Sequence, residues 1–184
     1  MLFKMKFSVQ ILAFLFMLTS ALSALARTAT PAELDQLATT IKDYESALKG
    51  NDVDKILTTL PPQLFQQLAK QAHIDESQIH QLVKDQLKQM TSTVTLDEIK
   101  IDFAHKRSGE LDDGSPYYII PLELAVTNQD NNKMKLESAF IALLYQNQWY
   151  LVRGDNAGFL DVMKTAFPGF EKIVIDPPKI QKLH

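Results

Sequence analysis

Residues 117–144 read YYIIPLELAVTNQDNNKMKLESAFIALL, and this stretch decides the fold. Apolar side chains occupy every second position on both sides of the polar segment 128–132, as in two strands that each bury one face. The short connection predicts that these strands are antiparallel neighbours. Residues 99–103 alternate in the same way, and a tight polar connection leads into a last short strand at 149–153. We therefore predict an antiparallel sheet over about residues 93–153.

Proline has no backbone N–H, so its position within a predicted strand carries information. Pro121 lies in the middle of the first strand of this hairpin. We expect the strand to be bulged there or to pair on one side only.

Upstream of the sheet the apolar residues recur with the period of a helix. Thr30-Pro31-Ala32-Glu33 combines a capping box with a proline at the first helical position, and a single apolar stripe follows from Leu34 to Leu48. Three shorter helical segments follow before residue 93, and residues 157–184 are predicted to form a short helix and a surface tail. These patterns predict a single α+β domain over residues 27–184, with the helices covering the apolar face of the sheet.

Residues 1–26 have the three-part layout of a secretory signal peptide: lysines near the start, an apolar stretch over 7–18, and small residues ending in Ala-Leu-Ala. Cleavage is predicted between Ala26 and Arg27. The apolar stretch is shorter than the roughly 20 residues that a spanning helix needs, so we expect no membrane anchor after cleavage. The short basic start is typical of bacteria and predicts a periplasmic or secreted protein.

Composition excludes several classes of function. The chain has 184 residues and no cysteine, which excludes a disulfide scaffold, a thiolate nucleophile and a cysteine zinc site. Its 19 basic and 22 acidic residues leave a net charge of -3, without the basic block that nucleic-acid binding requires. The six glycines are scattered singly, so no phosphate-binding loop is present and no cofactor is predicted.

The order of the elements, helices followed by a curved antiparallel sheet, resembles the cystatin-like cone of the nuclear-transport-factor-2-like superfamily. The resemblance covers about residues 30–155 and includes Tyr44 near the end of the first helix, the segment Lys49-Gly50-Asn51-Asp52, and the final strand Gln148–Arg153. It implies an exported bacterial member of the superfamily. Because members include enzymes, ligand carriers and interaction modules, the resemblance implies a fold and no single function. The catalytic His and Asp of its enzymes have no counterpart here.

The predicted inner face of the sheet lacks groups for acid–base catalysis. From residue 99 to residue 144, only Tyr118 and Ser138 bring a polar atom to that face. Proton transfer needs a titratable group held near the reacting proton, so we predict no catalytic residue. Glu123 and Glu137 fall on the opposite face beside lysines, which predicts a solvated surface with cross-strand ion pairs.

The other candidates for chemistry are weak. The four histidines do not converge, and no metal site is predicted. Arg153 is interpreted as the end of the last strand and Gly154 as a turn, although with Asp155 they spell an adhesion tripeptide.

Two regions are candidates for binding. The interior of the cone either holds a small apolar ligand or is packed solid, and packing is the more common outcome for such residues. Its candidate lining is Tyr44, Phe65, Met90, Tyr118, Phe140 and Trp149. The second face of the sheet is more apolar than solvation requires, so it either contacts a second copy or another exported protein, or is covered by the terminal helix. Its candidate contact residues are Tyr117, Ile119, Ile141, Leu143 and Tyr145.

The sequence thus predicts an exported, non-catalytic binding domain that acts through one of these two regions. Two alternatives stay open at this point. One is an enzyme of the same superfamily with a polar pocket that the sequence does not locate. The other is an inhibitor or immunity-type protein directed against an exported enzyme.

Overall fold

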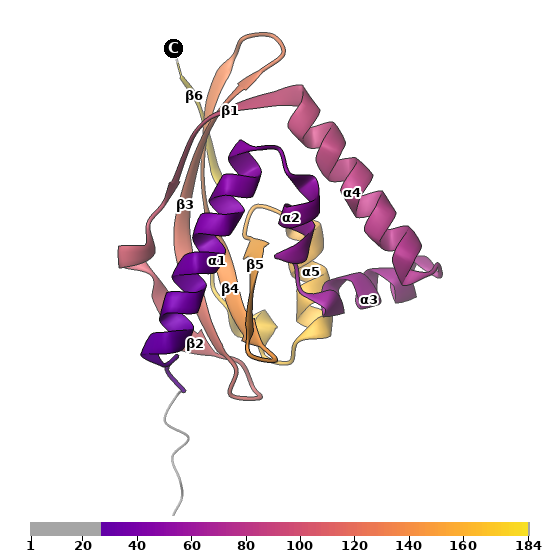
Figure 1. The fold of residues 1–184 in the computed structure, drawn as a ribbon, viewed down its shortest axis with the longest axis vertical. Coiled ribbons are helices and arrows are strands. Elements are labelled where there is room, and N and C mark those ends of the chain that lie inside the picture. Colours follow the sequence, from indigo (N-terminus) through magenta and orange to yellow (C-terminus); the bar gives the residue numbers. More distant parts are fainter. Residues whose placement is uncertain (1–26, 184) are drawn as a thin grey trace, which may run out of the picture.

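Four helices precede the strands of a strongly curled antiparallel sheet, and the first of these helices lies along one face of that sheet (Figure 1). The computed structural model describes residues 27–183, so the predicted signal peptide lies outside the described residues. The helices are α1 (Pro31–Lys49), α2 (Val53–Thr58), α3 (Pro62–Ala72), α4 (Glu76–Thr93) and α5 (Ala157–Ala166). The strands are β1 (Val94–Ile101), β2 (Arg107–Glu110), β3 (Pro116–Asn128), β4 (Lys133–Tyr145), β5 (Gln148–Arg153) and β6 (Lys179–Leu183). The predicted α+β class is confirmed, and the curled sheet is compatible with the predicted cone.

The sheet is built on its two longest strands, β3 and β4, which pair along almost their whole length. Ile120 lies opposite Phe140 and Leu124 opposite Leu136, so the alternating apolar residues of the two strands share one face. Strands β1 and β2 share the free edge of β3, and β5 and β6 share the free edge of β4. The sequence-predicted hairpin is therefore the centre of the sheet.

Pro121 occupies a break in this pairing. The backbone N–H of Asp102 donates to the Pro121 carbonyl at 2.9 Å, on the edge of β3 where β1 ends and the short 3₁₀ helix η1 (Phe103–His105) precedes β2. The N–H and C=O of one strand residue point to the same edge. The missing donor of Pro121 therefore faces the interruption between β1 and β2, while its other edge pairs with β4. The prediction of one-sided pairing is confirmed.

Two segments differ from the sequence-based prediction. Residues 179–183, which the sequence predicts to lie in a surface tail, form β6 along β4. Residues 107–110, for which no alternating apolar pattern predicts a strand, form β2 along β3. All of β6 is exposed and β2 is only four residues long, so neither shows an alternating apolar pattern. Both strands form because β1 and β5 leave part of the long edges of β3 and β4 unpaired.

The two faces of the sheet belong to two separate cores. On the concave face, α1 packs on Phe140, Trp149 and their neighbours in the first core. On the opposite face, α3, α5 and the first half of α4 pack on Ile141, Leu143 and Val152 in the second core. Sequence analysis left open whether the terminal helix covers the second face, and in the structure both faces are covered at the β4–β5 side.

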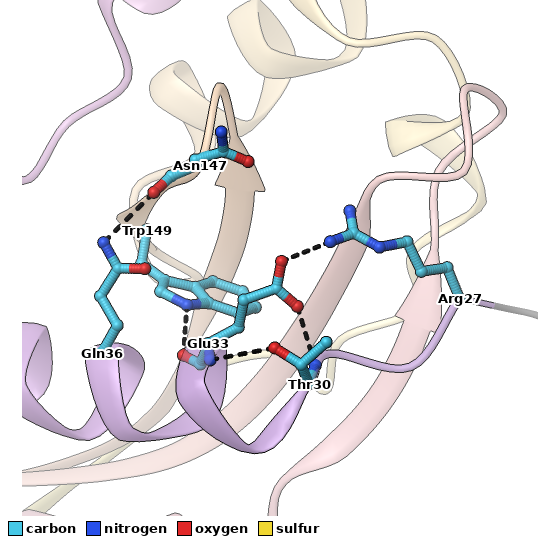
Figure 2. Close-up of polar contacts among 6 residues, drawn as sticks. All are labelled: Arg27, Thr30, Glu33, Gln36, Asn147 and Trp149. Atoms are coloured by element: carbon cyan, nitrogen blue, oxygen red, sulfur yellow. Dashed lines mark hydrogen bonds and ion pairs between the residues drawn. The ribbon is translucent and has the colours of Figure 1, made fainter.

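The start of α1 is tied to the turn between β4 and β5, as Figure 2 shows. Thr30 and Glu33 form the predicted capping box, with the Glu33 N–H donating to Thr30 Oγ1 at 3.2 Å and the Thr30 N–H donating to Glu33 Oε2 at 2.8 Å. The Trp149 indole N–H donates to the Glu33 carbonyl at 2.7 Å, and the Gln36 amide donates to the Asn147 carbonyl at 3.2 Å. These contacts hold α1 against one end of the concave face.

Candidate functional site

The other end of the concave face is hollow. A pocket of about 560 Å³ lies between the sheet, the end of α1, α2 and the second half of α4. Its walls are mainly apolar, and the apolar lining comprises Leu48, Ile56, Leu60, Leu87, Met90, Val94, Leu96, Leu124, Val126, Leu136, Leu151, Ala157 and Phe159. Natural ligand pockets have volumes of about 300–1,000 Å³ and mostly apolar walls with a few polar groups. The pocket has the size and lining of a small-molecule site.

Helix α4 spans this space, and its middle is held by Leu87, which packs partly against both cores, and by an ion pair between Lys84 and Asp54 of α2. Ile79 and Val83, its buried residues, lie in the first half and belong to the second core. At the other end Thr93 leads directly into Val94 of β1, with no connecting loop. Between these anchors the helix passes over the pocket, and Met90 is 51% exposed at the pocket rim.

One end of the pocket is polar, and its central group is Arg153. Trp149, Leu151 and Arg153 alternate along β5, so the arginine side chain enters the concave face with the two apolar ones. Its Nε donates to Asp155 Oδ1 at 2.9 Å, and its Nη2 donates to Asp155 Oδ2. The side chains of this bidentate pair are 26% and 18% exposed. Such pairing fixes the planar guanidinium as well as neutralising it.

Tyr44 of α1 lies beside this pair and also lines the pocket. Burial raises the pKa of Tyr44 above its ordinary value, against the opposing effect of the nearby Arg153 guanidinium. For Arg153, burial lowers the pKa, but the hydrogen bond to Asp155 and the proximity of Tyr44 outweigh it and raise the pKa overall. Tyr44 is therefore a neutral phenol and Arg153 a permanent cation near neutral pH.

The residues predicted to line the cone are divided between three places. Tyr44 and Met90 line the pocket. Tyr118, Phe140 and Trp149 are buried in the packed core under α1, where the Tyr44 and Phe140 rings meet edge to face at 4.9 Å. Phe65 is in the second core, with its ring stacked on His80 at 3.8 Å. The cone is thus packed solid under α1 and hollow under α4.

The predicted contact face of the sheet is covered within the chain. Ile119, Ile141 and Leu143 are buried, and Tyr117 and Tyr145 are half-buried. The Tyr145 ring meets Phe167 edge to face at 5.6 Å, just beyond the end of α5. In the structure the terminal helix α5 covers this face, which is one of the two alternatives that the sequence left open. A partner that contacts Ile141 or Leu143 would have to displace α5. The expectation of an exposed contact face is corrected, because Ile141 and Leu143 are buried in the second core, Tyr117 and Tyr145 pack against that core, and Ile119 is itself buried.

Charged residues on the half of the same hairpin nearer the 128–132 turn form one cross-strand ion pair, as predicted, and one ion pair within β4. Lys135 Nζ lies 3.0 Å from Glu123 Oε2 and 3.0 Å from Glu137 Oε1. Its hydrogen bonds to Glu123 and Glu137 raise the pKa of Lys135, and the same lysine lowers the pKa of Glu137. All three side chains are partly solvated, which identifies a stabilised surface and no reactive group.

Three histidines lie in the described part of the chain, and all three are exposed: His73, His80 and His105. His105 Nδ1 lies 2.7 Å from Asp102 Oδ2, and His80 Nε2 lies 3.8 Å from Glu76 Oε1. Within residues 27–183, no three His, Cys, Asp or Glu side chains are grouped so as to hold a metal ion.

Sequence analysis missed Arg153 and Asp155 as site residues. The signal was present, because Arg153 is two positions after Leu151 and four after Trp149, and alternation places all three on one face. Sequence analysis considered the concave face only as far as residue 144 and interpreted Arg153 as the end of a strand within an adhesion tripeptide. The Arg153 side chain was therefore not assigned to the concave face.

Comparisons with known proteins found no matching family model, no matching curated protein and no matching solved structure. Along the described part of the chain, none of the helices combines the length and apolar character needed to cross a bilayer.

Proposed function

We propose that this chain is an exported, non-catalytic member of the nuclear-transport-factor-2-like fold type that binds a small apolar ligand in the pocket under α4. The observation that carries the proposal is the pocket itself: about 560 Å³ of unfilled, mainly apolar space with one polar end. The pocket opens to solvent beside Met90 and Val94, so its apolar walls are exposed to water, which costs free energy. A ligand that fills the pocket recovers this cost.

The contacts of Arg27 support export with cleavage after Ala26. The backbone nitrogen of Arg27 lies 2.9 Å from Glu110 Oε2. After the proposed cleavage this nitrogen is the terminal ammonium, and the hydrogen bond becomes an ion pair. The Arg27 side chain also pairs with Glu33 of the capping box (Figure 2). The proposed mature end is thus anchored from its first residue.

The polar end of the pocket also bears on the enzyme alternative. That alternative needs a polar pocket in the cone, and Arg153, Asp155 and Tyr44 provide polar groups there. Acid–base catalysis needs a group that gains and loses a proton near the working pH. The arginine does not do so, Asp155 is occupied by its bidentate pair, and the pKa of Tyr44 is raised. These groups favour binding over catalysis.

The proposal is tested by titrating the mature protein with N-phenyl-1-naphthylamine, an uncharged probe whose fluorescence rises in apolar surroundings. Leu136 lies on the floor of the pocket, so Leu136→Trp should fill it and weaken probe binding by roughly tenfold. The control is Leu82→Trp, the same change at an exposed position of α4 outside the lining. Equal binding by both variants, with both folded by circular dichroism, would contradict the proposal.

Native mass spectrometry of the protein purified gently from the exported fraction of its host provides an independent test. The spectrum reports the cleavage point and any ligand retained by the subunit. A mass beginning at Arg27 with additional small-molecule mass is the expected result. A mature mass that begins at another residue would contradict the proposed cleavage point.

A further inference from the structure

We propose that the ligand of this pocket is an uncharged amphiphile, whose hydrogen-bonding head lies against the Arg153–Asp155 pair and whose apolar tail extends under α4. This inference rests on the proposed function, because it names the class of ligand that the pocket takes. It follows from the balance of charge in the lining and from the position of the polar groups at one end.

The lining carries no net charge. Of the described residues that line the pocket, Arg153 and Asp155 are the only charged ones, and they neutralise one another through two hydrogen bonds. All other polar lining residues are uncharged: Tyr44, Asn51, Gln86, Thr91, Thr93 and Asn156. A charged head entering the pocket would therefore find no free counter-ion.

A charged head would also meet repulsion from one member of the pair. A carboxylate that approaches Arg153 must displace Asp155 or lie beside it, and an ammonium that approaches Asp155 must do the same with Arg153. Moving a charge out of water without a partner is far more costly than moving a neutral polar group. The built-in ion pair thus selects against both signs of charge.

A neutral head, in contrast, finds both donors and acceptors. The guanidinium has five N–H groups and uses two of them on Asp155, which leaves three for Tyr44 and a ligand. The Asn156 side-chain oxygen accepts from the Phe159 N–H at 3.0 Å, so its NH₂ group is left to donate. A hydroxyl, ester or amide group has the oxygen acceptors that these donors require.

The pocket leads from this polar end to a rim where apolar residues lie beside Thr91 and Thr93, whose hydroxyls donate to carbonyls of their own helix. Met90 is 51% and Val94 is 36% exposed, and both belong to the lining. Between the rim and Arg153 the floor consists of apolar strand residues, including Leu124, Leu136 and Leu151. An apolar tail therefore lies along the strands, with the head group at Arg153.

The test compares decanol, decanoate and decylammonium, which share one alkyl chain and differ in head charge. Each displaces N-phenyl-1-naphthylamine from the mature protein at about pH 7. We expect decanol to bind roughly tenfold more tightly than either ion. Asp155→Asn leaves Arg153 without its counter-ion, so decanoate should gain roughly tenfold and become the preferred ligand.

Arg153→Gln provides the opposite variant. It leaves Asp155 as the charged group of the pocket, so decylammonium should become preferred, and this variant decides the question if Asp155→Asn does not fold. The matched control is Asp161→Asn, which removes an exposed carboxylate paired with Lys164 at 2.8 Å on α5. It changes the net charge by the same amount as Asp155→Asn and should leave the order of the ligands as in the wild type.

The outcomes separate this inference from the proposed function. If the wild type binds decanoate or decylammonium as tightly as decanol, the neutral-head inference is wrong and the pocket proposal stands. If Asp161→Asn reverses the preference as Asp155→Asn does, overall charge decides the selectivity and the inference is equally wrong. If neither the probe nor any of the three ligands binds the wild type, the proposed function fails.

Discussion

Replacing Trp149 with phenylalanine tests the contact that positions α1 on the sheet. Trp149 is 1% exposed, and its indole N–H donates to the Glu33 carbonyl at 2.7 Å across the first core. Phenylalanine keeps an aromatic ring in the same place and removes the donor together with two ring carbons. The substitution therefore removes one specific bond and a small part of the packing.

The expected loss of stability combines two effects. A neutral hydrogen bond contributes about 0.5–1.5 kcal/mol net. The two buried ring carbons contribute about 0.8 kcal/mol each by the transfer scale for apolar groups. The free energy of unfolding should therefore fall by about 2–3 kcal/mol. For a chain of this size the corresponding fall in melting temperature is about 4–12 °C.

The measurement is thermal and urea unfolding of the mature protein followed by far-ultraviolet circular dichroism, since Trp149 is the single tryptophan and its fluorescence is lost. Tyr150→Phe is the matched control: it changes the next residue of β5, which is 7% exposed, and removes one hydroxyl. The control should cost less than about 1 kcal/mol. Equal losses in the two variants would refute the role given to the indole bond.

Two further predictions concern a helix cap and a turn. The hydrogen bond from the Thr30 backbone N–H lowers the pKa of Glu33 from 4.5. The stability that ionised Glu33 contributes is therefore complete above pH 4.5, and it is lost as the pH falls through the lower pKa that Glu33 has in the folded state. Glu33→Gln, which keeps the acceptor, should flatten the fall in stability as the pH is lowered below 4.5; urea melts with unchanged pH dependence would contradict this. Gly169 has φ 91°, and an added Cβ would lie 2.7 Å from the Asp112 nitrogen, so Gly169→Ala should cost more than about 1 kcal/mol in thermal melts. Gly114→Ala, at φ 80° with no atom within 4 Å, should cost less, and the reverse order would show that the close approach is unimportant.

The binding proposals depend on the same tertiary arrangement that these variants test. If Trp149→Phe loosens α1, Tyr44 at the far end of that helix loses its position beside Arg153. Probe binding in this variant should then weaken even though Trp149 does not line the pocket. Unchanged probe affinity would show that the pocket end of α1 is held independently, by α2 and the sheet.

Local patterns in the sequence were enough to predict the secondary structure of the central elements. Alternation over residues 117–144 predicted the β3–β4 hairpin, and the structure confirms its pairing, for example Ile120 opposite Phe140. The capping box at Thr30 predicted the start of α1. These predictions succeed because side-chain period and capping are local properties, set by the geometry of a strand or of a single helical turn.

The tertiary structure alone decided what each surface contacts and where space is left. An apolar stripe on β4 has the same sequence whether a partner or α5 covers it, and only the folded chain shows that α5 does. The pocket lies where α4 passes over the sheet, an arrangement of long-range contacts that no local period records. Arg153 and Asp155 become a site for the same reason: the strand places the arginine on the concave face by its parity, but only the folding of α1, α2 and α4 around it encloses the pair in apolar walls.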